Sequence, residues 1–288
     1  MNLQEINQKI KSKEEAIQND SKMMNALNAM KSYSGIDKII SSEEAMEAIK
    51  NNNLSERKNY YSKLLKLDDL TGGFRGGQLI VLSAPTGQGK TQFLQNLTHN
   101  FADQDIPCLW FSYEMGQEEL FDRFGGEVPS FYLPSKMKES SMEWLKMRVL
   151  EGIAKHDTKV IFIDHLHFLL EMGDMAKTHN LSILIGMMMR ELKKIAIATD
   201  TIIFLVSHMG KSMLEKKAPS IEDLRDSSFV AQESDIVMML WREKMNDTLS
   251  PTGWSFTNQS NLIVVKNRRT GKLGSVKMVF NNGKFIEL

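Results

Sequence analysis

Short apolar runs alternate with segments of helical periodicity from residue 66 to the end of the chain. Runs such as LIVLS and TIIFLVS are almost wholly apolar, which is typical of strands buried on both faces of a parallel sheet. Alternation of such strands with helices favours an α/β fold in which helices flank a central, mostly parallel sheet. The predicted strands are 79–83, 108–112, 160–164, 201–207, 235–240 and 262–266, and the predicted helices are 90–101, 117–125, 141–155 and about 180–199.

The two ends of the chain follow different patterns. Residues 1–60 are polar and hold too few apolar residues for a core of their own, so they predict a helical N-terminal arm or linker. Within it, 21–31 and a segment capped by Ser42 are the expected helices. At the other end, the dipeptide NG at 282–283 separates two short strand-like runs and predicts a hairpin. The predicted organisation is therefore an arm over 1–60 and one α/β domain over 61–288.

The segment APTGQGKT joins the first predicted strand to the first predicted helix of this domain. It nearly matches G-x-x-x-x-G-K-[ST], with alanine where the first glycine is expected. In such a loop, backbone N–H groups and the helix N-terminus cradle phosphate, the lysine reaches the β- and γ-phosphates, and the hydroxyl binds Mg²⁺. The alternative is a glycine-rich turn with an incidental lysine. The predicted nucleotide-binding residues are Ala84, Pro85, Thr86, Gly87, Gln88, Gly89, Lys90 and Thr91.

Polar side chains end three further predicted strands. Asp164 closes VIFID, where a carboxylate at the carboxyl edge of a parallel sheet can hold Mg²⁺ through water. Glu114 follows CLWFS and could orient or deprotonate a water; a surface glutamate is the alternative. His208 ends FLVSH and could sense a γ-phosphate; a solvated loop histidine is the alternative. For His165 and His167, one and three residues after Asp164, we expect packing or polar roles rather than metal ligation.

Composition narrows the class of protein. The 288 residues are 42% hydrophobic and 25% charged, as in a globular protein, and Lys plus Arg equals Asp plus Glu at 36 each. A globally basic nucleic-acid binder is not indicated, although a local basic surface remains open. The single cysteine, Cys108, excludes an intramolecular disulfide and predicts a buried small hydrophobe. With no long apolar run and no signal-peptide pattern, we expect a cytoplasmic protein without a membrane partner, in the host cytoplasm if phage-encoded.

The motifs, in this order, resemble the motor domain of the DnaB-type replicative DNA helicases, a RecA-like family of hexameric P-loop NTPases. The resemblance begins with LDDLTGGFRGGQLIVLSAPTGQGKT, where alanine at the first loop position is also common in the family. It continues through FSYEM, VIFIDHLHFL, VSHMGK, DLRDSSFVAQESDIVMMLWRE and VVKNRRTGKLG, and covers about three-quarters of the chain. His208 stands where bacterial DnaB usually has glutamine; phage helicase–primases and mitochondrial Twinkle have histidine there.

The resemblance implies a RecA-like P-loop NTPase fold preceded by a helical arm, with ATP or another NTP and Mg²⁺ as cofactors. It implies that Glu114 is the catalytic glutamate and that the loop with Asp164 binds phosphate and Mg²⁺. Arg268 in KNRR matches an arginine finger that completes the next subunit's site, with Lys266 beside it. Arg269 is the rival for the finger. A finger stabilises the charge that develops on the γ-phosphate.

The implied assembly is a homo-oligomeric ring, typically of six subunits, that moves 5′ to 3′ on single-stranded DNA and unwinds forked duplex DNA during replication. Neither a DnaB-like collar nor a primase zinc finger is recognisable, so a separate primase or loader is expected. The expected DNA contacts come from two loops that would face the central channel of the ring, EMGDMAKTHN and MGKSMLEKKAPS. The alternative is that their lysines are only solvated. These lysines are Lys177, Lys211, Lys216 and Lys217. Trp254 and Phe256, expected in a loop before a strand, are weaker candidates for base stacking.

Two other functions stay open from the sequence. KNRRTG also resembles a motif of the RadA-like DNA-repair ATPases, but the N-terminal zinc finger and the C-terminal protease-like domain of that family are not recognisable here. A non-catalytic loader or scaffold with the same fold is the second alternative. Such a protein is expected to have lost Lys90, Glu114 or Arg268, and all three are retained.

Overall fold

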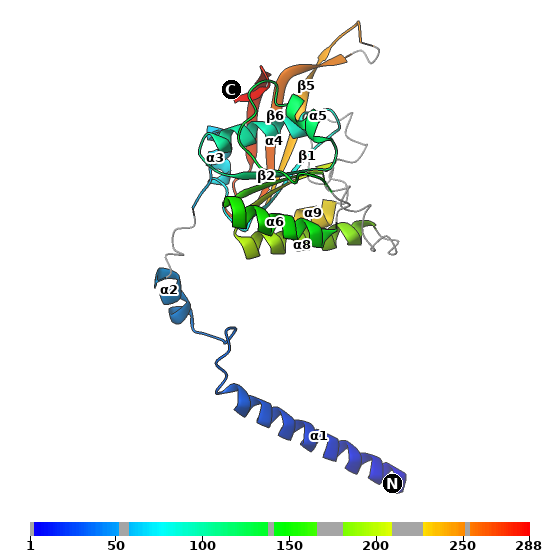
Figure 1. Cartoon of the computed structure of the whole chain (residues 1–288). Helices are drawn as coiled ribbons and strands as arrows, with labels where there is room; N and C mark the ends of the chain where they lie inside the picture. Colours follow the sequence, from blue (N-terminus) through cyan, green and yellow to red (C-terminus); the bar gives the residue numbers. More distant parts are fainter. Residues whose placement is uncertain (1–2, 52–57, 138–140, 166–180, 209–226, 251–253) are drawn as a thin grey trace. The chain divides into compact units, whose positions relative to one another are not determined.

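The computed structural model describes residues 3–51, 58–137, 141–165, 181–208, 227–250 and 254–288 (Figure 1). The chain divides into two compact units, Met1–Glu56 and Arg57–Leu288. No helix among the described residues is long and apolar enough to cross a membrane.

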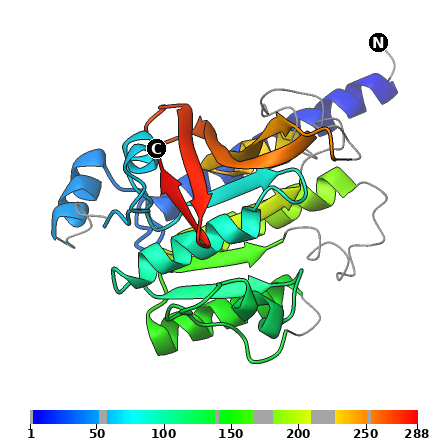
Figure 2. The same cartoon turned by 90° about the horizontal axis from the view of Figure 1, so that it is seen from above.

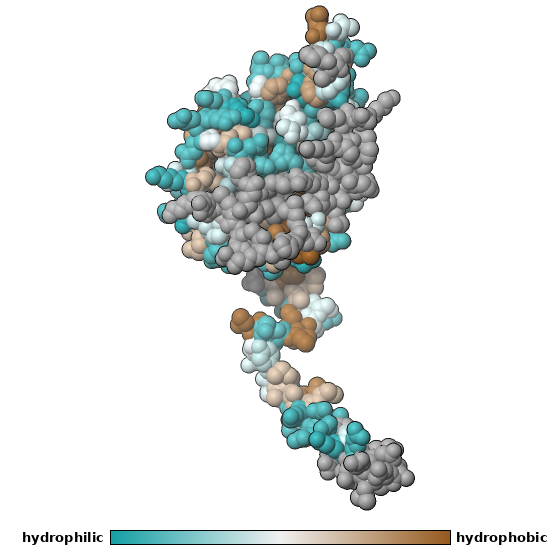
Figure 3. Space-filling view, turned by 90° about the vertical axis from the view of Figure 1, so that its right-hand side faces the viewer, coloured by the Kyte–Doolittle hydropathy of each residue, from teal (hydrophilic) through white to brown (hydrophobic). Residues whose placement is uncertain are grey.

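The N-terminal unit contains α1 (Leu3–Met30) and α2 (Ser42–Asn51). One continuous helix therefore includes the predicted helix 21–31. The prediction that Ser42 caps the second helix is wrong, because Ser41 and Glu44 form the capping pair: the Ser41 hydroxyl accepts from the Glu44 N–H at 3.1 Å, and the Glu44 carboxylate accepts from the Ser41 N–H at 3.2 Å. No residue of α2 is buried, and hydrophobic atoms reach the surface of this unit (Figure 3).

The second unit is built on an eight-stranded sheet with the order β2-β3-β4-β1-β5-β6-β7-β8. Strands β1 to β5 pair in parallel, and β5 to β8 pair antiparallel. The prediction of a mostly parallel sheet with flanking helices is confirmed, and β1 to β5 form its parallel part. The strands are β1 (Leu79–Ala84), β2 (Cys108–Ser112), β3 (Val160–Asp164), β4 (Ile202–His208), β5 (Ile236–Asn246), β6 (Trp254–Asn267), β7 (Gly274–Asn281) and β8 (Lys284–Glu287).

Helices cover both faces of the sheet (Figure 2). They are α3 (Leu65–Thr71), α4 (Lys90–Ala102), α5 (Gln117–Asp122), α6 (Met142–His156), α8 (Leu181–Thr199) and α9 (Ser227–Glu233). Strand β1 shows why the strands are apolar throughout: Ile80 and Leu82 pack in the same cluster as α4, whereas Leu79 and Val81 pack with α6 and α8. Each such side chain contributes about 1.5–3 kcal/mol by leaving water.

Three local predictions have clear outcomes. Helix α5 ends at Asp122, short of the predicted 117–125, and the positive φ angles of Gly125 and Gly126, 68° and 142°, prevent it from reaching residue 125. The NG hairpin is confirmed: Asn282 and Gly283 have φ angles of 48° and 79° and connect β7 to β8. Cys108 is buried, and burial raises the pKa of its thiol, so it is a packing residue.

The prediction that Trp254 and Phe256 lie in a loop is wrong. Both belong to β6, where Trp254 pairs with Asn246 and Phe256 pairs with Lys244 of β5. The Lys244 ammonium lies 3.8 Å from the centroid of the Trp254 ring, a cation–π contact across the two strands. Polar residues around both aromatics hid the strand, because the end of this ribbon is only partly buried.

Candidate functional site

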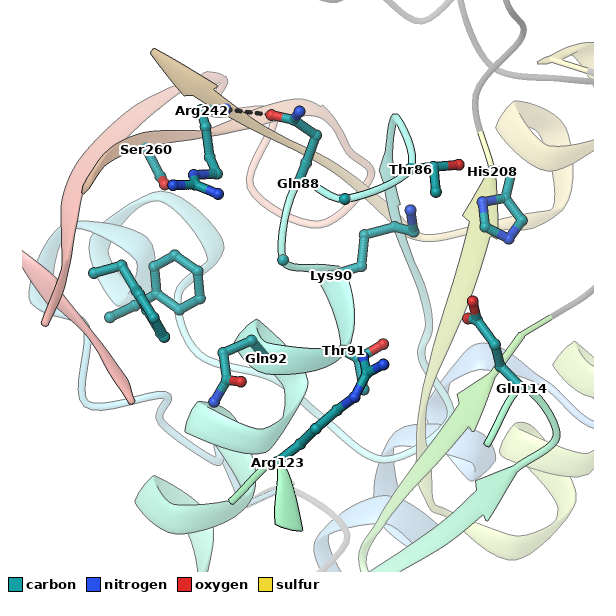
Figure 4. Close-up of a pocket in the computed structure, with 14 residues that line it drawn as sticks. Thr86, Gln88, Lys90, Thr91, Gln92, Glu114, Arg123, His208, Arg242 and Ser260 are labelled. Carbon is teal, nitrogen blue, oxygen red and sulfur yellow. Dashed lines mark hydrogen bonds between the residues drawn. The ribbon is translucent and has the colours of Figure 1, made fainter. Parts of the chain in front are cut away.

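A cavity of about 280 Å³ opens over the N-terminus of α4 (Figure 4). Four parallel strands, β1 to β4, bring their carboxyl ends to this side of the sheet. This edge is where α/β sheets bind ligands, because backbone N–H groups and polar strand ends converge there. The lining residues are Thr86, Gly87, Gln88, Gly89, Lys90, Thr91, Gln92, Glu114, Arg123, His208, Arg242, Ser260, Phe280 and Phe285.

The loop between β1 and α4 is held in shape by its own backbone and by β5. Gly89, which caps α4, has a φ angle of 89°, and a Cβ there would lie 3.3 Å from the Phe285 ring. The Gln88 side-chain oxygen accepts a hydrogen bond from the backbone N–H of Arg242 in β5 at 2.7 Å. Gly87 to Thr91 line the cavity, so the N-terminus of α4 faces it, as an anion site requires.

Lys90 is the first residue of α4, directly after this loop. Its ammonium donates to the carbonyl oxygens of Ala84 and Pro85 at 3.0 and 3.2 Å. Burial lowers the pKa of Lys90, and the charges of Asp164 and Glu114 oppose that effect. Among the described residues this buried ammonium donates to neutral carbonyls, so it gains strongly from an anionic ligand and is suited to a phosphate group.

Thr91 and Asp164 form the second part of the site. The Thr91 hydroxyl donates to Asp164 Oδ2 at 2.6 Å, and Asp164 is 1% exposed. Asp164 Oδ1 is buried and has no hydrogen-bond partner among the described residues. Mg²⁺ uses few protein oxygens and keeps several waters, so a hydroxyl beside a carboxylate oxygen with spare capacity fits this ion.

Asp164→Asn is expected to stabilise the nucleotide-free chain at neutral pH. Burial raises the pKa of Asp164 from 3.8 to about 6, so the folded chain holds this proton more tightly than the unfolded chain does. Stability of the wild type relative to the variant is expected to fall as pH rises from about 4 to about 6, because the unfolded state releases the proton first. The full difference is on the order of 3 kcal/mol.

Urea unfolding at about pH 4 and about pH 7 measures this difference. Asp122→Asn, at an exposed position of α5, is the matched control and should show no pH-dependent gain. Equal effects of Asp164→Asn at both pH values would show that burial of the Asp164 carboxylate is not costly.

Glu114 and His208 lie across the cavity from the phosphate loop (Figure 4). The end of β2 is tied to the end of β3, because the N–H groups of Tyr113 and Glu114 donate to the Asp164 carbonyl at 2.7 and 3.3 Å. The Glu114 side chain is 42% exposed, and its Oε2 lies 3.9 Å from His165 Nδ1. His165 and His208 are in edge-to-face contact, with ring centroids 4.2 Å apart.

Six lining residues were not anticipated from the sequence: Gln92, Arg123, Arg242, Ser260, Phe280 and Phe285. Most come from strands β5 to β8, which fold back over α4. The Gln92 amide donates to the Gly283 carbonyl at 3.0 Å, and the Phe285 N–H donates to the Asn96 side chain at 3.1 Å. Phe280 and Phe285, with centroids 5.0 Å apart, thereby give the cavity an apolar wall. No local sequence signal marks the four residues on β5 to β8, because these strands are far from the loop in the chain.

Lys266, Arg268 and Arg269 do not line the cavity of their own chain. The Lys266 ammonium donates to two carbonyls in and after α9, and burial lowers the pKa of Lys266 to about 8. The Arg269 guanidinium donates to the carbonyls of Thr71 and Gly73 and to the Asn59 side chain. Arg268 is exposed, although its guanidinium also donates to a carbonyl of α9.

The predicted DNA-binding residues Lys177, Lys211, Lys216 and Lys217 lie outside the described residues, as does His167. The contacts proposed for these lysines therefore stay predictions.

Comparison with known proteins agrees with this architecture. The family described as DnaB-like helicase C terminal domain matches residues 60–130 and 129–286. Relatives include the probable replicative DNA helicase of Trieres chinensis, 25% identical over 257 residues, or 77% of this chain and 55% of that protein. The replicative DNA helicase DnaB of Mycoplasma genitalium is 28% identical over 258 residues, or 77% of this chain and 54% of that protein. The chain spans about half the length of these curated relatives.

Two solved structures share the fold. One, described as an ATPase domain, superposes with a TM-score of 0.71 at 22% identity, covering 86% of this chain and 99% of that chain. A DnaB-like replicative helicase, whose structure was described with its interactions with primase, superposes with a TM-score of 0.70 at 22% identity, covering 96% of this chain and 76% of that one. The family match extends over most of the α/β unit, and the chain belongs to the DnaB-like helicase C-terminal domain family.

Proposed function

We propose that this chain is the ATP-hydrolysing motor of a ring-forming DNA helicase, which translocates 5′ to 3′ on single-stranded DNA and unwinds duplex DNA during replication. The observation that carries the proposal is one cavity lined by the phosphate loop, Lys90, Glu114 and Thr91, whose hydroxyl donates to the buried Asp164 carboxylate. Membership of the DnaB-like family supports it.

The cavity divides into two halves that suit the two ends of a nucleoside triphosphate. Loop N–H groups and Lys90 take the phosphates, and Phe280 and Phe285 offer an apolar wall to a base. Mg²⁺ held by Thr91 and Asp164 would neutralise charge on the β- and γ-phosphate oxygens. Glu114 is exposed to solvent at the cavity edge, where its carboxylate can orient a water toward the terminal phosphate.

The proposal includes a neighbouring subunit that supplies Arg268. Arg268 is exposed and does not line the cavity of its own chain, so as a finger it would have to reach the site of a neighbouring subunit. Helix α1 supports oligomerisation, because Met23, Leu27 and Met30 are exposed at helical spacing on one face. We propose that this arm, as the part of the chain without a core, packs on a neighbouring subunit and that a separate primase or loader completes the machinery.

A forked DNA substrate tests this function. The full chain with Mg²⁺ and ATP is expected to unwind a fork with a 5′ single-stranded tail and to leave a substrate with only a 3′ tail intact. Single-stranded DNA should stimulate the ATPase, and salt should weaken DNA binding. Lys90→Ala is the control and should neither unwind nor hydrolyse.

Each alternative gives a different result. DNA-stimulated ATPase with no unwinding of either fork, even with primase or loader added, would favour a repair ATPase resembling RadA. A chain that binds DNA without hydrolysing ATP would favour a loader or scaffold.

A further inference from the structure

Beside the phosphate loop, the described residues bring together three side chains that commonly ligate metals. They are Glu114, His165 and His208, and one ligand atom from each lies within 4.8 Å of the other two. Two imidazoles and one carboxylate form a set of donors typical of Zn²⁺ sites. Thr91 and Asp164, by contrast, offer only oxygen, which suits Mg²⁺.

We propose that Glu114, His165 and His208 bind a transition-metal ion of the Zn²⁺ class, at a site separate from that of Mg²⁺. Nitrogen donors favour Zn²⁺ over Mg²⁺, and site affinity for first-row divalent ions rises toward Cu²⁺ and Zn²⁺. The inference rests on the proposed function in one respect: if Glu114 orients the attacking water, an ion at this site turns hydrolysis off.

The backbone holds the three ligands in place. They follow or end β2, β3 and β4, which are neighbours in the sheet. Glu114 is drawn to the end of β3 by its N–H bond to the Asp164 carbonyl, and His165 follows that same carbonyl. The donors therefore converge before any ion arrives, which lowers the conformational entropy lost on binding.

Only small side-chain movements complete the site. His165 Nδ1 and Glu114 Oε2 are 3.9 Å apart, and donors in a tetrahedral Zn²⁺ site are about 3.3 Å apart, given metal–ligand bonds of about 2.0 Å. His165 is 7% exposed and serves as the fixed ligand. Glu114 is 42% exposed, so its side chain has room to close the remaining gap. The proposal gives His165 a ligand role in place of the packing or polar role expected from the sequence.

Occupancy has a direct consequence for the cavity. An ion at this site engages the Glu114 carboxylate and the His208 ring, the two groups that face the terminal phosphate across the cavity. Excess Mg²⁺ does not displace it, because the two ions use different ligand sets. Inhibition by Zn²⁺ is then expected to persist at high Mg²⁺ when the free Zn²⁺ concentration is held constant.

Co²⁺ titration of the nucleotide-free full chain tests the site. Co²⁺ with four or five ligands absorbs visible light much more strongly than hydrated, six-coordinate Co²⁺ does. One equivalent per chain is expected to bind, to be displaced by Zn²⁺ and to resist excess Mg²⁺. Glu114→Gln and His165→Gln should each weaken Co²⁺ binding at least about 10-fold. His156→Gln is the matched control; this histidine stacks on Tyr132, with ring centroids 3.9 Å apart, and should bind Co²⁺ as the wild type does.

The outcomes separate this inference from the proposed function. Absence of the visible spectrum, or an unchanged spectrum in both Glu114→Gln and His165→Gln, overturns the site. Glu114 is exposed, so loss of binding in Glu114→Gln with an unchanged circular dichroism spectrum reports a ligand rather than a folding defect. If the wild-type chain binds Co²⁺ but hydrolyses no ATP, the result supports the metal site and contradicts the proposed function.

Discussion

Glu114→Gln is expected to lower kcat for ATP hydrolysis by about 10²–10⁴-fold, the usual contribution of a positioned general base. The amide keeps the size of the carboxylate but cannot take a proton from water. Nucleotide affinity should stay close to that of the wild type, because the proposed phosphate contacts come from the loop and Lys90 on the other side of the cavity. Single-turnover hydrolysis and equilibrium nucleotide binding together measure the two effects.

Two further variants serve as controls for Glu114→Gln. Glu118→Gln, an exposed position in the first turn of α5 that does not line the cavity, should hydrolyse ATP at the wild-type rate. Lys90→Ala should lose nucleotide affinity as well as turnover, because its ammonium is the buried cation of the phosphate loop. If Glu114→Gln retains wild-type kcat, another group activates the water.

Arg268→Ala is expected to lower kcat by about 10³–10⁵-fold, as loss of an arginine finger does, without destabilising the chain. Arg269→Ala is the contrasting variant. Its guanidinium holds the carbonyls of Thr71 and Gly73, so its loss should lower the free energy of unfolding by about 1–3 kcal/mol. Steady-state ATPase assays and urea unfolding of both variants distinguish the two roles.

Mixing variants tests whether Arg268 acts on a neighbour. A ring that contains both Glu114→Gln and Arg268→Ala subunits has some interfaces where an intact Glu114 meets an intact Arg268. At equal amounts about one interface in four is complete, so the mixture should hydrolyse ATP faster than either variant alone. A mixture no faster than the single variants, in rings shown to exchange subunits, would place Arg268 outside the neighbouring site.

Local patterns were sufficient for the parallel half of the fold. Strands β1 to β4 and helices α4, α6 and α8 were predicted within one or two residues, because a doubly buried strand must be apolar throughout and a flanking helix must repeat its apolar face. The antiparallel half of the sheet was harder to predict from the sequence. Its β5–β6 ribbon extends past the core, and there the buried pattern that reveals a strand is absent.

The sequence by itself determined the phosphate loop and its partnership with Asp164. The loop lies between a buried strand and a helix, and Asp164 ends a second buried strand; the Thr91–Asp164 hydrogen bond follows from that placement. Tertiary structure alone decided what surrounds this centre. Strand order and register decide the apolar wall, the hydrogen bond between Gln88 and Arg242, the carbonyl contacts of the Arg269 guanidinium and the approach of His165 to Glu114. Periodicity indicates which side chains face inward, but strand pairing over more than 100 residues of chain decides which of them meet.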